Sequence, residues 1–103
     1  MKKTKIIATL GPACDNVKTL RQMVLNGMNV ARINLSHSNK DSLIKLVELV
    51  KKVRTEMKTD LAIMVDTKGP EIRTGVFENG KAKLKKGQTF TFFKENIVGD
   101  ETK

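Results

Sequence analysis

Cysteine, histidine and the larger aromatic residues are almost missing from this sequence. Among its 103 residues there is one cysteine and one histidine, and there is neither tryptophan nor tyrosine. A single cysteine forms no internal disulfide, which is typical of a reducing cytosol, so a cytoplasmic location is expected. The same scarcity excludes the ligand spacing of a zinc finger. The four phenylalanines offer little aromatic surface for stacking nucleic-acid bases.

Long apolar runs are absent as well. None approaches the ~20 residues that span a bilayer, so no membrane partner is expected. The first residues, MKKTKIIATLGPAC, combine basic residues, a short apolar run and a cysteine, loosely like a bacterial export signal. The uninterrupted run IIA is far shorter than the ~7–15 residues that such a signal requires. Export is therefore disfavoured.

Positive charge is in excess. The net charge is +9, from 20 lysines and arginines against 11 aspartates and glutamates. Such an excess favours anionic partners, namely nucleic acid, phosphorylated metabolites or acidic lipid. The basic residues are spread along the chain, and only KAKLKK (residues 81–86) is locally dense. A solvated basic surface explains this better than a nucleic-acid site, and no nucleic-acid partner is expected.

Apolar segments alternate with amphipathic ones in the first two thirds of the chain. Buried strands that alternate with amphipathic helices indicate a parallel α/β sheet covered by helices. Either a doubly wound sheet or a (β/α)8 barrel fits, and both place ligand sites at the carboxyl ends of the strands. We expect strands over residues 4–10, 28–35 and 61–65, a helix capped by Asp15 or Asn16 and ending near Asn26-Gly27, and a second helix capped within SHSNKD whose apolar stripe runs from Leu43 to Met57.

The pattern changes after about Thr74. The stretch GVFENGKAKLKKGQTFTFF alternates with period two, and Asn79-Gly80 and Lys86-Gly87 are turn signals. Short antiparallel strands are therefore predicted there. This divides the chain into a first domain, residues 1–73, and a second β domain that begins at residues 74–103.

Polar side chains lie where two of the predicted strands end. Because side chains alternate across a strand, Arg32 and Asn34 share one face, and Ser36 joins them if the extended path continues. Asp66 and Thr67 end the next strand. Carboxylate, amide, hydroxyl and carbonyl oxygens suit a hard cation such as potassium, sodium or magnesium. A phosphoryl-transfer site requires a cation next to a cationic side chain such as arginine.

Simpler interpretations exist for each of these residues alone. Asp66 precedes a Gly-Pro turn and could merely cap it. Arg32 could pair with a carboxylate elsewhere, and His37 could be a loop or capping residue. Cys14 has no base nearby in the sequence and is expected to be inert. Two successive strand ends with matching polar groups favour function over these alternatives.

Three stretches, KIIATLGPA, GMNVARINLSHS and DTKGPEIRTG, closely resemble the N-terminal part of the pyruvate kinase family. The resemblance implies the first three strands of a (β/α)8 TIM barrel and the start of a small inserted β-barrel domain. It implies phosphoryl transfer from phosphoenolpyruvate to ADP, giving pyruvate and ATP in glycolysis. It further implies Mg²⁺ and K⁺ as cofactors and a homotetramer for the full-length enzyme.

The resemblance also implies roles for individual residues. Arg32 would contact the transferring phosphoryl group, and Glu71 occupies the position where a carboxylate accompanies potassium dependence. Arg73 would contact nucleotide phosphates, with His37 lining the nucleotide side. Potassium would be held by the side chains of Asn34, Ser36 and Asp66 and by the carbonyl of Thr67.

This stretch contains only some of the catalytic and metal-binding residues of the family. The acid-base lysine and the Mg²⁺ carboxylates have no counterpart here, so the Mg²⁺ ligands are expected outside this chain. The chain alone is then expected to be an inactive fragment. The alternative is a free-standing basic module that binds anionic ligands or nucleic acid.

Overall fold

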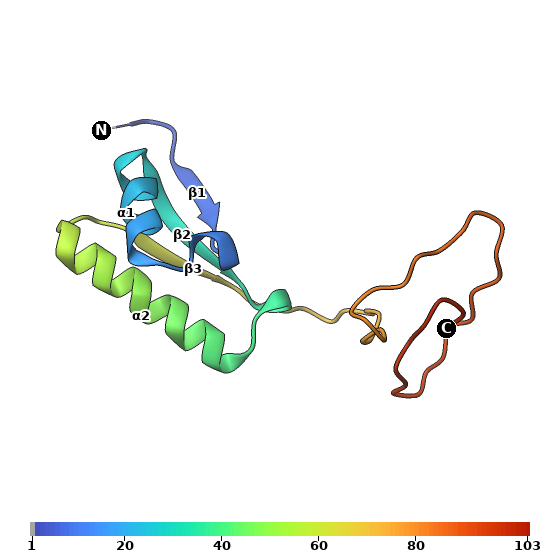
Figure 1. Ribbon diagram of the computed structural model, residues 1–103. Coiled ribbons are helices and arrows are strands. Elements are labelled where there is room, and N and C mark those ends of the chain that lie inside the picture. The colour runs from blue at the N-terminus through green and yellow to red at the C-terminus, as the bar shows by residue number, and fades with distance from the viewer. Residues whose placement is uncertain (1) are drawn as a thin grey trace. The chain divides into compact units, whose positions relative to one another are not determined.

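The computed structural model describes residues 2–103, except for the side chain of His37. The chain divides into two compact units, one up to Gly69 and one over residues 70–103. The first unit has the predicted β-α-β-α-β order (Figure 1). Its elements are β1 (Ile6–Thr9), η1 (Pro12–Cys14), α1 (Val17–Leu25), β2 (Met28–Asn34), η2 (Leu35–His37), α2 (Lys40–Met57) and β3 (Ala62–Asp66), where η1 and η2 are short 3-10 helices.

The three strands form one parallel sheet in the order β1-β2-β3, with β2 in the centre. The predicted alternation along β2 is confirmed, because Ala31 and Ile33 are completely buried whereas Arg32 and Asn34 are only partly so. Ala31 and Ile33 pack against side chains of both helices. The two helices therefore cover the same face of the sheet, and we call the opposite face the open face.

The core lies between this covered face and the helices. Leu20 of α1, Val50 and Val53 of α2, and Ile33 of β2 are completely buried. Burying a side chain of this size contributes about 1.5–3 kcal/mol, so these few contacts account for much of the unit's cohesion. The parallel α/β architecture predicted from the alternating apolar segments is confirmed.

Asparagines begin both α-helices. The side chain of Asn16 accepts a hydrogen bond from the Thr19 amide at 2.9 Å. Asn39 accepts one from the Ser42 amide at 2.8 Å, and the Ser42 hydroxyl accepts one from the Asn39 amide at 3.0 Å. These bonds satisfy amides that lack partners in the first helical turn. Helix α2 ends at Met57, and the next residue, Lys58, caps it in a left-handed conformation with φ 47°.

The second unit corrects the prediction of antiparallel strands. Its residues form one isolated, parallel bridge, between Phe77 and Gly99, and no regular strand. Both turn signals are confirmed: the Gly80 amide donates to the Phe77 carbonyl, and the Gln88 amide to the Lys85 carbonyl. Isolated strand pairs are marginal in water unless an apolar face is buried. Here the apolar side chains of Leu84 and Phe92 are exposed, so they do not provide the buried apolar face that would stabilise strand pairs.

Candidate functional site

The site is built around Arg32, at the carboxyl end of the central strand. Register places Thr9 of β1 beside Arg32, and Asn34 beside Asp66 of β3. The Nη1 of Arg32 donates a hydrogen bond to the Thr9 hydroxyl at 2.8 Å, and its Nη2 forms an ion pair with the Asp66 carboxylate. The structure thus brings together Arg32 and Asp66, the two charged groups that the sequence predicted at adjacent strand ends.

Both charged groups are accessible to solvent. The exposed fraction is 28% for the Arg32 side chain and 48% for that of Asp66. Ion pairs this exposed contribute little to folding stability, so stability alone is a weak reason for the pair. Two of the five N–H hydrogens of the guanidinium bind Thr9 and Asp66, which leaves three directed elsewhere. A fixed guanidinium with spare donors is well suited to bind a phosphate or carboxylate.

Oxygen atoms gather next to this guanidinium. Asn34 and Asp66 are register partners and therefore lie side by side on the open face. Thr67 directly follows the end of β3. Such a set contains one full negative charge and otherwise neutral oxygens, which fits a singly charged hard cation. Among the described residues, no three histidine, cysteine, aspartate or glutamate side chains converge on a metal position.

The expected position of Ser36 needs a correction. The strand ends at Asn34, and the extended path does not continue, because residues 35–37 turn into η2. The cause is local: the Asn34 Oδ1 accepts a hydrogen bond from the Ser36 amide at 3.0 Å and so folds the chain back. Ser36 therefore stays within one turn of Asn34 rather than lying farther along the strand. The side chain of His37 lies outside what the structure describes.

Glu71 and Arg73 form a pair in the second unit. The Arg73 Nη2 donates to the Glu71 Oε1 at 3.3 Å, and its Nε donates to the other carboxylate oxygen. This hydrogen bonding, followed by the charge of Glu71, raises the pKa of Arg73 above its ordinary value. A spacing of two residues places both side chains on the same side of extended backbone. The sequence showed both residues but not this pairing.

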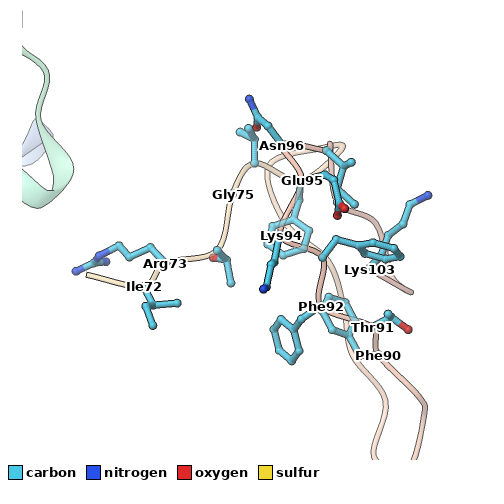
Figure 2. Close-up of a pocket in the computed structure, with 16 residues that line it drawn as sticks. Ile72, Arg73, Gly75, Phe90, Thr91, Phe92, Lys94, Glu95, Asn96 and Lys103 are labelled. Atoms are coloured by element: carbon cyan, nitrogen blue, oxygen red, sulfur yellow. The ribbon is translucent and has the colours of Figure 1, made fainter. Parts of the chain in front are cut away.

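Each unit contains a cavity. That of the first unit, about 620 Å³, lies at the carboxyl end of the sheet and is lined by Thr9, Pro12, Asn34, Ser42 and Lys45 among others. One in the second unit, about 600 Å³, is bordered by Phe90 and Phe92, and Figure 2 shows the Arg73 side chain pointing away from these rings. Phe92 is 82% exposed, so this second cavity is open to solvent rather than an enclosed ligand pocket.

Thr9 is the member of the site that sequence reasoning missed. It stands at the end of the first strand, as Arg32 and Asp66 stand near the ends of the next two. The sequence signal that could have identified Thr9 is its hydroxyl at the end of a strand, next to two strands that also carry polar groups near their ends. It was overlooked because a threonine in an apolar, β-branched stretch also reads as an ordinary strand residue.

Comparisons with known proteins agree on one family. The family model described as pyruvate kinase, barrel domain, matches residues 1–103. The pyruvate kinase of Clostridium perfringens is 48% identical over the whole chain, and that of Clostridium acetobutylicum is 46% identical. The chain spans 22% of the length of each of these relatives.

Solved structures give the same result. A crystal structure of Cryptosporidium parvum pyruvate kinase is 41% identical and superposes with a TM-score of 0.88, covering 97% of this chain and 21% of that one. A second structure of that protein, in complex with ADP, superposes with a TM-score of 0.84 over 97% of this chain and 20% of that one. The family model matches all 103 residues of this chain, and the sheet of the chain is parallel. The chain therefore belongs to the pyruvate kinase family, as an N-terminal part of the barrel domain.

Proposed function

We propose that the protein containing this chain transfers a phosphoryl group from phosphoenolpyruvate to ADP, giving pyruvate and ATP. The observation that supports this most directly is the Arg32 guanidinium, held on two sides at the carboxyl edge of the sheet. Three of its N–H donors remain for a ligand. Phosphoryl transfer depends on positioned positive charge around the equatorial oxygens, which a fixed guanidinium supplies.

Potassium is the cation that we assign to the first unit. Asn34, Ser36, Asp66 and the carbonyl of Thr67 would hold it, and their single carboxylate suits one positive charge. When bound, the ion adds positive charge beside the anionic substrates. Asp66 serves two neighbours in this proposal, because its carboxylate also orients Arg32. The Mg²⁺ ligands would lie outside this chain.

The second unit would contact the nucleotide. Arg73 would bind the nucleotide phosphates, and its pairing with Glu71 holds the guanidinium in place until they arrive. The other nucleotide-binding residue that the family resemblance implies is His37, in the first unit. A solved structure of the related Cryptosporidium parvum pyruvate kinase is in complex with ADP, which supports a nucleoside diphosphate as one substrate.

Activity would require more than this chain. Relatives are more than four times as long, since the chain covers 22% of them, and a (β/α)8 barrel alone runs to ~250 residues. We expect residues 1–103 alone to be inactive, and the complete enzyme to be a cytoplasmic homotetramer. Within the described residues, no helix is both long and apolar enough to cross a membrane.

The decisive experiment uses a hybrid enzyme, in which residues 1–103 replace the matching segment of the Clostridium perfringens relative. We expect it to form pyruvate from phosphoenolpyruvate and ADP with Mg²⁺ and K⁺, whereas residues 1–103 alone do not. Arg32→Ala should lower turnover of the hybrid at least 100-fold, the scale seen when a transition-state donor is removed.

The matched control is Arg21→Ala. Arg21 of α1 forms an ion pair with Glu56 of α2, on the helical side of the sheet. This variant removes a guanidinium and an ion pair but leaves the open face intact, so its turnover should stay near that of the hybrid. A folded hybrid that forms no pyruvate, or an Arg32→Ala variant as active as the Arg21→Ala control, would contradict the proposal.

A further inference from the structure

We infer that Thr9 is a positioning residue for catalysis, because its hydroxyl holds the Arg32 guanidinium in the orientation that meets the phosphoryl group. The inference rests on the proposed function of Arg32. It concerns a hydroxyl at the end of β1, which the resemblance to the family had not singled out.

The geometry gives Arg32 one support from each neighbouring strand. Thr9 and Arg32 are register partners between β1 and β2, and the Nη1–Oγ1 distance is 2.8 Å. On the other side, Nη2 of Arg32 meets the carboxylate of Asp66 on β3. The two terminal nitrogens are thus held separately, which fixes the plane of the guanidinium and not merely its position.

A single support would not fix that plane. The arginine side chain is long and has several rotatable bonds, so a guanidinium tied only to Asp66 could turn about that contact. Small errors in the placement of a reacting group reduce rates strongly, because the reacting atoms must be aligned. The Thr9 hydroxyl supplies the second contact without adding charge, so it does not weaken the attraction between Arg32 and an anionic ligand.

The Thr9 hydroxyl has little structural use apart from this contact. Thr9 is exposed at the end of β1 and is not part of the core. In the described part of the chain, its side-chain hydrogen bond is the one to Arg32. Replacing the hydroxyl by a methyl group keeps the shape and the β-branched character that suit a strand. A Thr9→Val variant should therefore fold normally.

The test compares Thr9→Val and Thr9→Ser in the active hybrid enzyme. Loss of a hydrogen bond to a charged group typically reduces a rate by about tenfold or more. We expect Thr9→Val to lower kcat/KM for phosphoenolpyruvate by at least tenfold and to leave KM for ADP unchanged. Thr9→Ser retains the hydroxyl and should stay within about threefold of the hybrid.

A double-mutant cycle separates positioning from a general structural effect. Lysine lacks the forked guanidinium that Thr9 holds. In an Arg32→Lys background, adding Thr9→Val should therefore lower kcat/KM for phosphoenolpyruvate by less than a further threefold. If the fold-losses of Arg32→Lys and Thr9→Val multiply fully in the double variant, the inference is wrong. It is also wrong if Thr9→Val and the parent hybrid are equally active. Thr55→Val, on the exposed surface of α2, is the matched control and should change neither turnover nor the unfolding temperature.

The two proposals fail in distinguishable ways. If Arg32→Ala lowers turnover and Thr9→Val does not, the role of Thr9 is wrong and the proposed function stands. If Arg32→Ala has no effect, the proposed role of Arg32 is wrong, and the inference about Thr9 fails with it. A loss in Thr9→Val that is accompanied by a lower unfolding temperature, and not restored by Thr9→Ser, would also count against positioning.

Discussion

The charge of Arg32 is tolerated because its strand has one covered face and one open face. Ala31 and Ile33 point to the helices and are completely buried, whereas Arg32 points to the open face and keeps contact with water. Burying an unpaired guanidinium would cost several kcal/mol. Strand alternation avoids that cost and places a permanent charge where a ligand can reach it.

The carboxylate of Glu71 is expected to set the potassium requirement. In the hybrid, Glu71→Lys replaces an anion by a fixed cation and also removes the partner of Arg73. We expect activity without potassium to rise relative to activity with it, because the family resemblance associates a carboxylate at this position with potassium dependence and a lysine with independence. Turnover measured over a potassium titration checks this.

A charge reversal elsewhere in the second unit is the control for that experiment. Glu78 is exposed and lies in the same unit. Glu78→Lys should leave the potassium requirement intact. If the Glu71→Lys and Glu78→Lys variants need the same potassium concentration, the role assigned to Glu71 is wrong.

The carboxylate of Asp100 has a pKa below its ordinary value of 3.8. The hydrogen bond from the Thr102 hydroxyl is the main cause, followed by the one from the Thr102 amide. These bonds favour the charged form, so the turn gains stability above the ordinary pKa and loses it as the pH falls through the lowered one. Thr102→Val should raise the pKa of Asp100, which an NMR titration of its carboxyl carbon measures; an unchanged pKa would refute the assignment.

At the scale of elements, the capping box of α2 is expected to control the first turn of that helix. Asn39→Ala removes the acceptor of the Ser42 amide. Loss of such a cap costs about 1 kcal/mol, which is roughly a fivefold change in an opening equilibrium. Native-state hydrogen exchange of the hybrid should show faster exchange in this turn, with Asn39→Asp close to the parent. Equal exchange in Asn39→Ala would show that the box is dispensable.

Local patterns predicted the elements of the first unit well, and the reason is physical. The helical stripe that includes Val50 and Val53, and the alternation around Ala31 and Ile33, describe faces that pack against one another within the same unit. In the second unit the turns at Asn79-Gly80 and Lys86-Gly87 were predicted correctly, but the period-two pattern was wrongly interpreted as strands. A strand forms only when partners bury its face, and pattern alone does not reveal whether those partners are present.

For the site, the sequence predicted which strand ends carry polar groups but not how they pair. Arg32 and Asp66 could be named because charged residues interrupt apolar segments there. Their ion pair and the Thr9 contact depend on register, which follows from the packing of three strands rather than from any one of them. The roles of Asn34, Ser36, Asp66 and Thr67 toward potassium remain predictions, as do the domain assignments over residues 1–73 and 74–103.

At the scale of the whole molecule, the sheet is incomplete by itself. Strands β1 and β3 each have a single neighbour, and Ile7 and Met64 are exposed apolar side chains. Unpaired edges and exposed apolar surface promote association. Residues 1–103 alone should self-associate with rising concentration and increase the fluorescence of a hydrophobic dye. Light scattering and dye titration test this, and a monodisperse monomer without dye binding would contradict it.

The spatial order of the strands is also the order in which they are synthesised. Thr9 and Arg32 leave the peptidyl-transferase centre first, and Asp66 follows Arg32 by 34 residues. At ~5–20 residues per second, that interval is about 2–7 s. During it the nascent chain contains Thr9 and Arg32 but not yet the carboxylate that pairs with Arg32 in the folded sheet. Of the two groups that hold the guanidinium, the charged one, the Asp66 carboxylate, is therefore the last to be synthesised.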